Sequence, residues 1–271
     1  MKDKFDEKTI KQKFDLAGNV IIITGGTGLL GEFFACGVAE FGGFPVIVDI
    51  NQSKCDSLAE RIKENYKVET LGIKTDVSNK EDVERMLKLT LARFGRVDVL
   101  VNNAQHKPKE TFTNRFEEYT VKQWDDVMAV NLRGLFLCTQ IIGRQMIKQG
   151  KGNIINMAST YGVVSPDQRI YTNTNIGCPA VYSASKGGVI AFTKHMATYW
   201  ATKNIRVNAL SPHGVFANHE ALFVKNFSTR SPMNRMSYKD EVVGALIFLA
   251  SDASSYVTGH NLMVDGGWSI W

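Results

Sequence analysis

A tyrosine and a lysine lie four residues apart in a stretch with helical character, at Tyr182 and Lys186. Residues at i and i+4 share one face of a helix, so the phenol and the ammonium group can face the same site. A free phenol has a pKa of about 10 and is a poor base at neutral pH, but a nearby positive charge lowers that pKa. The pair could therefore exchange a proton with a substrate hydroxyl or carbonyl group. By itself, the spacing also fits an ordinary pair on a helix surface.

A glycine-rich turn precedes this pair by about 150 residues and follows an apolar run at residues 19–24. The unbroken run is typical of a strand buried on both faces, and a helical pattern follows the turn. Glycines allow the backbone to approach a pyrophosphate closely, and a helix N-terminus offers free N–H groups. The turn therefore predicts a dinucleotide site. Its contacts are expected at Gly25, Thr27, Gly28, Leu30 and Gly31.

Two acidic residues end the next two strand-like runs. Asp49 lies about 20 residues beyond the glycine turn, where a carboxylate accepts a ribose 2′-hydroxyl and repels a 2′-phosphate. The turn also holds no Lys or Arg that would neutralise a 2′-phosphate. We therefore expect NAD(H) to be preferred over NADP(H). Asp76 is expected either to contact the adenine or to cap a helix together with Ser78.

The elements that must position these residues alternate along the chain. Strand patterns occur at residues 19–24, 45–50, 68–76, 97–102, 152–159, 205–210 and 261–265, and helical patterns at residues 28–41, 54–65, 81–94, 123–146, 179–202 and 240–250. Repeated β-α-β units predict an α/β, single-domain Rossmann-type fold, with a doubly wound parallel sheet and helices on both faces. We expect a polar tail at residues 1–13 and the domain at residues 14–271. Substrate loops are expected at about residues 105–120, 160–180 and 212–238.

Composition excludes several other classes of protein. The formal net charge is +5 and the basic residues are dispersed, so we expect no nucleic-acid partner. No apolar run approaches the roughly 18 residues of a membrane span, and the N-terminal segment lacks a signal-peptide pattern. We therefore expect a cytoplasmic protein with no membrane partner. The four cysteines have no metal-like spacing, so no metal site is expected and the thiols should be reduced.

In combination and order, these motifs resemble those of classical, single-domain short-chain dehydrogenases/reductases. The matching motifs beyond the glycine turn and Asp49 are Asp76-Val77, Asn102-Asn103-Ala104, Asn131, Ser159, Tyr182/Lys186, Asn208-Ala209-Leu210-Ser211-Pro212 and Val264-Asp265-Gly266-Gly267. The resemblance runs from about residue 14 to the C-terminus. It implies hydride transfer to or from a nicotinamide, and self-association as a homotetramer or dimer. The apolar C-terminal residues 268–271 fit burial against a second subunit or packing within their own domain.

The resemblance also implies roles for individual residues. Tyr182 would be the general acid/base, and Ser159 would bind the same substrate oxygen. Lys186 would bind the nicotinamide ribose and lower the Tyr182 pKa, while Asn131 would hold a water that links Lys186 to solvent. The implied cofactor contacts are Gly25, Thr27, Gly28, Leu30, Gly31, Asp49, Asp76, Val77, Asn103, Ala104, Tyr182, Lys186, Pro212 and Val215.

Four features depart from the family pattern. Three of them are substitutions: Leu29 in the glycine turn, Gln105 after Asn-Asn-Ala, and His213 with Ala217 where a glycine and a threonine are usual. Asn218 is the candidate to replace the threonine contact to the nicotinamide amide. The fourth is a polar insertion at about residues 165–179, which should border the substrate cleft. Its hydroxyl and amide groups suit a polyhydroxylated ligand, although a solvated surface insertion fits as well.

These observations predict an NAD(H)-dependent oxidoreductase that interconverts a secondary alcohol and a ketone on a polar, sugar-derived substrate. The substrate could be anionic, because a set of cationic or titratable side chains lies near the expected cleft. This set is His106, Lys107, Arg169, His213 and His219. The pattern is similar to sugar-acid dehydrogenases and to reductases of polysaccharide biosynthesis. The alternatives are a 3-oxoacyl thioester reductase and a non-catalytic dinucleotide-binding protein.

Overall fold

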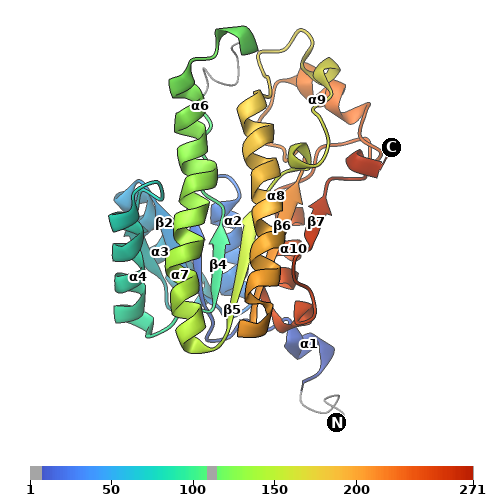
Figure 1. Cartoon of the computed structure of the whole chain (residues 1–271). Helices are drawn as coiled ribbons and strands as arrows, with labels where there is room; N and C mark the ends of the chain where they lie inside the picture. Colours follow the sequence, from blue (N-terminus) through green and yellow to red (C-terminus); the bar gives the residue numbers. More distant parts are fainter. Residues whose placement is uncertain (1–7, 109–114, 271) are drawn as a thin grey trace.

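The computed structural model describes residues 8–108 and 115–270. Within these ranges, seven parallel strands form one sheet in the order β3-β2-β1-β4-β5-β6-β7 (Figure 1). The strands are β1 (Val20–Thr24), β2 (Phe44–Asp49), β3 (Leu71–Lys74), β4 (Val99–Asn102), β5 (Gly152–Met157), β6 (Ile205–Pro212) and β7 (Asn261–Val264). The predicted Rossmann-type α/β fold is therefore confirmed.

Helices cover both faces of the sheet, as predicted. The main helices are α2 (Gly31–Glu40), α3 (Gln52–Tyr66), α4 (Lys80–Phe94), α6 (Val121–Met128), α7 (Leu135–Gln149), α8 (Ala180–Trp200), α9 (Ala221–Ser228) and α10 (Asp240–Ala250). In Figure 1, α7 and α8 lie in front of the sheet, whereas α2 and α10 lie behind it. No helix in the described ranges combines the length and apolarity that a membrane span requires.

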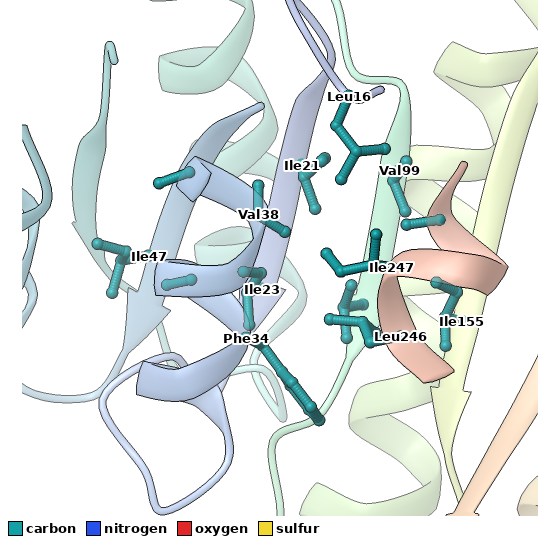
Figure 2. Close-up of a cluster of buried hydrophobic side chains, with 14 of the residues drawn as sticks. Leu16, Ile21, Ile23, Phe34, Val38, Ile47, Val99, Ile155, Leu246 and Ile247 are labelled. Atoms are coloured by element: carbon teal, nitrogen blue, oxygen red, sulfur yellow. The ribbon is translucent and has the colours of Figure 1, made fainter. Parts of the chain in front are cut away.

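Alternating side chains of the strands build one core on each face of the sheet. From β1, Ile21 and Ile23 pack with α2, α3 and α10, while Val20 and Ile22 pack with α4, α7 and α8. Figure 2 shows the first of these clusters, with Phe34 of α2 beside the β1 side chains. Full burial of an aliphatic side chain of this size contributes about 1.5–3 kcal/mol. Two apolar faces per strand explain why β1 is an unbroken apolar run.

The strand order reverses between β1 and β4. The chain passes from β1 through α2 to β2 on one side, and from β3 through α4 to β4 on the other. Because all strands run parallel, their carboxyl ends share one edge, and a crevice opens where the order reverses. The glycine turn follows β1 and Asn103 follows β4, so both lie at this point.

Several boundaries differ from the predicted ones. The segment at residues 123–146, for which one or two helices were expected, holds two, α6 and α7, and the π-helical turn (Ala129–Gly134) between them was not expected. The loop expected at residues 212–238 contains α9, whose Phe223 and Phe227 are buried. The described part of the predicted tail forms a short helix, α1 (Ile10–Lys13), with no buried residue. The tail's first seven residues, and residues 109–114 of the first predicted loop, lie outside the described ranges.

Candidate active site at the carboxyl ends of the strands

A cavity of about 630 Å³ lies at this edge of the sheet. Its volume is within the range of small-molecule and cofactor sites. Of the residues predicted for the site, those that line the cavity are Gly25, Thr27, Gly28, Leu30, Asp49, Asp76, Val77, Asn103, Ala104, Ser159, Tyr182, Lys186, Pro212 and Val215. Gly31 and Asn131 are the two predicted site residues that are not on the cavity wall.

Close packing of backbone explains the glycines of the first turn. Gly25 has a φ of +62°, and a Cβ there would lie 2.8 Å from Ala104 Cα. A Cβ on Gly31 would lie 2.1 Å from the Gly25 carbonyl oxygen, so Gly31 supports the turn from behind. The Asn103 amide donates to the carbonyl oxygens of Thr24 and Gly25, each at 3.0 Å. The turn is thus a rigid backbone cradle that a side chain would fill, as a pyrophosphate site requires.

Asp49 is held at the edge of this cradle. Its Oδ2 accepts hydrogen bonds from the Thr27 N–H at 3.1 Å and from Thr27 Oγ1 at 2.8 Å. A fixed carboxylate at this place fits the ribose of a dinucleotide. Lys54 of α3 also lines the cavity, so a cation does lie near this end of the site, although outside the glycine turn.

Asp76 also lies on the cavity wall, but it does not cap α4. Its Oδ1 accepts from the Ser78 N–H at 2.9 Å and from Ser78 Oγ at 2.7 Å, which closes a local turn. The residue that caps α4 is Asn79, whose side chain accepts from the Asp82 N–H at 2.9 Å. The predicted capping role of Asp76 is therefore wrong, and its contact with an adenine stays a prediction.

Ser159 and Tyr182 come from different elements and meet in the cavity. Ser159 follows β5 and begins a 3-10 turn (Thr160–Gly162), in which its Oγ accepts from the Tyr161 N–H at 3.2 Å. Tyr182 lies in the first turn of α8. Burial raises the pKa of Tyr182 to about 12, and a hydrogen bond from the Ser159 side chain acts in the opposite direction. A substrate oxygen that binds both hydroxyl groups would therefore meet a protonated phenol.

Lys186 lies on the same face of α8 as Tyr182. Its side chain is 3% exposed, and Nζ donates to the Met157 carbonyl oxygen at 2.7 Å. Nζ is 5.7 Å from the centre of the Tyr182 ring, and burial lowers the Lys186 pKa to about 8. The prediction that Tyr182 and Lys186 face the same site is confirmed. The expected lowering of the Tyr182 pKa is wrong for this structure, because burial is the largest influence on that pKa and raises it.

Asn131 lies behind the cavity wall and hydrogen-bonds to two segments of the site, one at His106 and one on α8. It lies in the π-helical turn, and its Oδ1 accepts from the His106 N–H at 2.8 Å. Its Nδ2 donates to Ser185 Oγ at 3.3 Å, and Ser185 Oγ in turn donates to the Tyr182 carbonyl oxygen at 2.8 Å. Short π-helical turns within helices are frequent at functional sites. The sequence did not reveal this turn, and the predicted water relay through Asn131 stays a prediction.

The predicted anion-binding set comes together only in part. His106, Lys107, His213 and His219 line the cavity. Arg169 is absent from the wall, because its guanidinium forms a bidentate pair with Asp167, with bonds of 2.9 and 2.8 Å, on the outside of the insertion. The insertion instead contributes Ile176 and Cys178 to the cavity. The polar side chains of the insertion that were expected in the cleft are thus largely surface groups.

An aromatic part of the wall contains residues that were missed from the sequence. Beside the predicted His213, its members that line the cavity are Tyr161, Phe223 and Phe227. The i, i+4 spacing of Phe223 and Phe227 was an available signal for a short amphipathic helix. Trp268 packs behind them, with its ring centre 4.7 Å from that of Phe227, so it is buried within its own domain. Trp271 lies outside the described ranges.

The predicted replacement for the missing threonine contact is not supported. Ala217 lines the cavity, whereas Asn218 is absent from its wall and has a φ of 55°. The short side chain of Asn218 tolerates this left-handed backbone, which indicates a role in the turn.

A family model of short-chain dehydrogenases/reductases, described as enoyl-(acyl carrier protein) reductase, matches residues 29–269. The chain belongs to the short-chain dehydrogenase/reductase family. Members of this family are dinucleotide-dependent oxidoreductases that act on CH–OH groups, and the chain is such an enzyme, using NAD or NADP. The glycine cradle and the Ser159–Tyr182–Lys186 arrangement fit that cofactor and that chemistry.

Three relatives within the family illustrate its range. The NAD-dependent glycerol dehydrogenase of Listeria innocua is 32% identical over 97% of this chain and 98% of its own length. The 3-oxoacyl-[acyl-carrier-protein] reductase of Synechocystis is 35% identical over 93% of this chain and 97% of its own. A gluconate 5-dehydrogenase from Burkholderia cenocepacia, solved with NADP and tartrate, has a TM-score of 0.85 and 33% identity, over 95% of this chain and 98% of that one.

Proposed function

We propose that this enzyme interconverts a secondary alcohol and a ketone on a polyhydroxylated, sugar-derived or polyol substrate, with NAD(H) preferred over NADP(H). The observation that carries the proposal is the cavity itself, in which the glycine cradle, Ser159, Tyr182 and Lys186 line one continuous space. The polyol and sugar-acid relatives support the substrate class, and the fixed carboxylate of Asp49 supports the cofactor preference.

The proposed mechanism is proton transfer at Tyr182. Ser159 and Tyr182 bind the substrate oxygen, and in the oxidative direction Tyr182 takes the hydroxyl proton as general base. In the reductive direction it donates that proton to the carbonyl oxygen. The bound nicotinamide supplies or accepts the hydride at the substrate carbon. Lys186, anchored by the Met157 carbonyl oxygen, keeps an ammonium group near the phenol and would bind the nicotinamide ribose.

A panel of substrates tests the proposal. The purified protein is incubated with NAD⁺ and neutral polyols or sugar acids, and with NADH and the corresponding ketones, while absorbance reports the reduced cofactor. We expect turnover of at least one polyhydroxylated alcohol. Absence of turnover on all of them, together with reduction of an acetoacetyl thioester, would overturn the proposal in favour of the second candidate.

That second candidate is 3-oxoacyl thioester reduction. It is favoured by the Synechocystis relative, which is named a 3-oxoacyl-[acyl-carrier-protein] reductase. Lys54 beside the cavity is a cation that could approach a 2′-phosphate, and the gluconate 5-dehydrogenase neighbour was solved with NADP, so cofactor preference does not separate the two candidates. A comparison of kcat/KM for an acetoacetyl thioester and for polyhydroxylated ketones separates them, and a clear preference for the thioester would favour the thioester reductase.

We further propose that the enzyme self-associates as a homotetramer or dimer and that it is cytoplasmic. We also propose polysaccharide biosynthesis as one pathway in which a sugar-derived substrate of this kind would be used. Exposed apolar residues on the outer helices support self-association, since Phe136 of α7 is 42% exposed and Tyr199 of α8 is 68% exposed. Light scattering after size-exclusion chromatography gives the oligomeric state, and a mass of one chain would contradict self-association.

A further inference from the structure

The aromatic part of the cavity wall carries two uncharged polar groups that the proposed mechanism does not use. These are the imidazole of His213 and the phenol of Tyr161, whose ring centres are 4.8 Å apart in an edge-on arrangement. Both residues line the same cavity as Ser159 and Tyr182. Their polar atoms lie among aromatic rings, so they are candidates to bind a polar group of the substrate.

His213 is held rigidly with an unsatisfied nitrogen. Its backbone N–H donates to the Val264 carbonyl oxygen at 3.0 Å, which fixes it between the ends of β6 and β7. Its ring centre lies 5.0 Å from that of Phe227 and 4.5 Å from that of Trp268, and the residue is 7% exposed. Nε2 has no hydrogen-bond partner among the described residues. A buried polar atom without a partner is unfavourable, so a ligand that supplies one gains affinity.

Tyr161 is fixed relative to the catalytic residues. It lies two residues after Ser159 in the 3-10 turn, and this turn packs directly on α8. The contact is so close that a Cβ on Gly162 would lie 2.7 Å from the Lys186 carbonyl carbon. Tyr171 of the insertion donates its hydroxyl hydrogen to Tyr161 Oη at 3.0 Å. A hydroxyl group has one donor and two acceptor positions, so accepting from Tyr171 leaves the Tyr161 hydrogen for a different acceptor.

The charge state of this wall selects among polar ligands. Burial lowers the pKa of His213 to about 4 and raises the pKa of Tyr161 well above its ordinary value. At neutral pH both groups are therefore uncharged, and they suit a hydroxyl group better than a carboxylate or phosphate. Phe223 and Phe227 supply apolar faces for the carbon skeleton. Of the cations expected to bind an anion, Arg169 points away to Asp167, and burial lowers the pKa of Lys107, which does line the cavity.

We propose that Tyr161 and His213 form a subsite for a second hydroxyl group, next to the reacting carbon, and that the substrate is an uncharged vicinal polyol or its hydroxyketone. The inference rests on the function proposed above and specifies its substrate. Because Nε2 is shielded from solvent, binding includes a small displacement of a neighbouring ring such as Phe227 on α9. The insertion acts indirectly, since its Tyr171 orients the Tyr161 hydroxyl.

Matched substrates and conservative variants test this subsite. We would measure kcat/KM with NAD⁺ for butane-2,3-diol, for butan-2-ol, which lacks the second hydroxyl, and for 2,3-dihydroxybutanoate, in which a carboxylate replaces one methyl group. One hydrogen bond to an uncharged group corresponds to a preference of roughly tenfold. We expect the wild type to favour the diol over both other compounds by at least that factor.

The variants His213→Phe and Tyr161→Phe keep the rings and remove the polar groups. Each should lower kcat/KM for the diol about tenfold more than kcat/KM for butan-2-ol, so that the preference is lost. Tyr256→Phe is the matched control, because Tyr256 is fully exposed and lies outside the cavity. Should His213→Phe fail to fold, Tyr161→Phe gives the same comparison, and NADH binding confirms an intact dinucleotide site.

Two results would overturn the subsite. One is an equal loss of activity on diol and monoalcohol in both variants, which would indicate a purely structural role. The other is a wild-type preference for the carboxylate compound, which would contradict the uncharged substrate but leave the oxidoreductase function intact. Failure of the proposed function itself would look different, since the wild type would then oxidise no polyol, sugar acid or monoalcohol.

Discussion

At the scale of single residues, burial governs the chemistry of the site. Tyr182 and Lys186 lie on one helix face, and the protein interior favours the neutral form of each, raising one pKa to about 12 and lowering the other to about 8. A general base with a raised pKa is only slightly ionised at neutral pH. We therefore expect the rate of alcohol oxidation to rise with pH, because the phenolate is the form that accepts the proton.

The role of the lysine charge is tested by Lys186→Met. Without the ammonium group the phenolate is less favoured, so the pH profile of oxidation should move to higher pH and kcat/KM at pH 7 should fall about 100-fold. Steady-state kinetics across a pH series measure this shift. Lys194→Met is the control, since Lys194 is exposed on the same helix. An unshifted profile in Lys186→Met would show that the lysine acts only through structure.

We expect the cofactor preference to depend on Asp49. Replacing it with serine removes a negative charge from the cavity wall, where we expect the 2′ position to bind, and leaves Lys54 nearby. We expect the Kd of NADPH to fall about tenfold, a difference of about 1.4 kcal/mol, and the Kd of NADH to rise. Fluorescence titration measures both constants, and Asp125→Ser on exposed α6 is the control. Unchanged relative affinities in Asp49→Ser would contradict the assigned role.

At the scale of elements, the site depends on how helices meet strand ends. The glycine turn joins β1 to α2, and Asn103 after β4 binds the turn's carbonyl oxygens. The 3-10 turn after β5 packs on α8 and brings Ser159 to Tyr182. The π-helical turn between α6 and α7 places Asn131 against His106 and Ser185. The side chains of Lys186 and Asn131 are each held by backbone of a second element, through the Met157 carbonyl oxygen and the His106 N–H.

Gly31 tests the contact between α2 and the glycine turn. In Gly31→Ala the new Cβ would lie 2.1 Å from the Gly25 carbonyl oxygen, so the turn must move. We expect a clear loss of thermal stability and at least tenfold weaker NADH binding. Gly244→Ala on α10 is the matched control, because its Cβ meets nothing within 4 Å. A helical alanine there should stabilise the fold by about 0.5–1 kcal/mol. Equal behaviour of the two variants would contradict this explanation.

At the scale of the whole molecule, the sequence predicts the sheet and its nucleotide site well. The periodicity of the apolar residues and the turn residues between elements identify each strand and most helices. Gly25, Asp49 and Asn103 come together because the carboxyl ends of parallel strands lie at the same edge of the sheet. Features that depend on tertiary packing could not be read in advance. Arg169 forms an ion pair with its neighbour Asp167 and does not line the cavity. The pKa of Tyr182 is raised because the fold buries the phenol. The π-helical turn has no local sequence signature.

His213 links the site to global stability. Its folded-state pKa of about 4 lies below the unfolded value of 6.5, so between these pH values the unfolded chain binds more protons. Folding stability from this group is present above pH 6.5 and is lost as the pH falls toward 4, by up to about 3 kcal/mol. Urea unfolding of the wild type and of His213→Phe should therefore diverge in this window, with the wild type losing more stability. Parallel curves would contradict a buried neutral imidazole.

The most direct test of the account is Tyr182→Phe, which removes one oxygen atom and leaves the cavity shape unchanged. If Tyr182 is the general acid/base, kcat should fall by at least about 100-fold while the Kd of NADH changes less than about threefold. Single-turnover kinetics with fluorescence titration on the same preparation give both values. Activity near the wild-type level in this variant would contradict proton transfer by Tyr182 and with it the proposed mechanism.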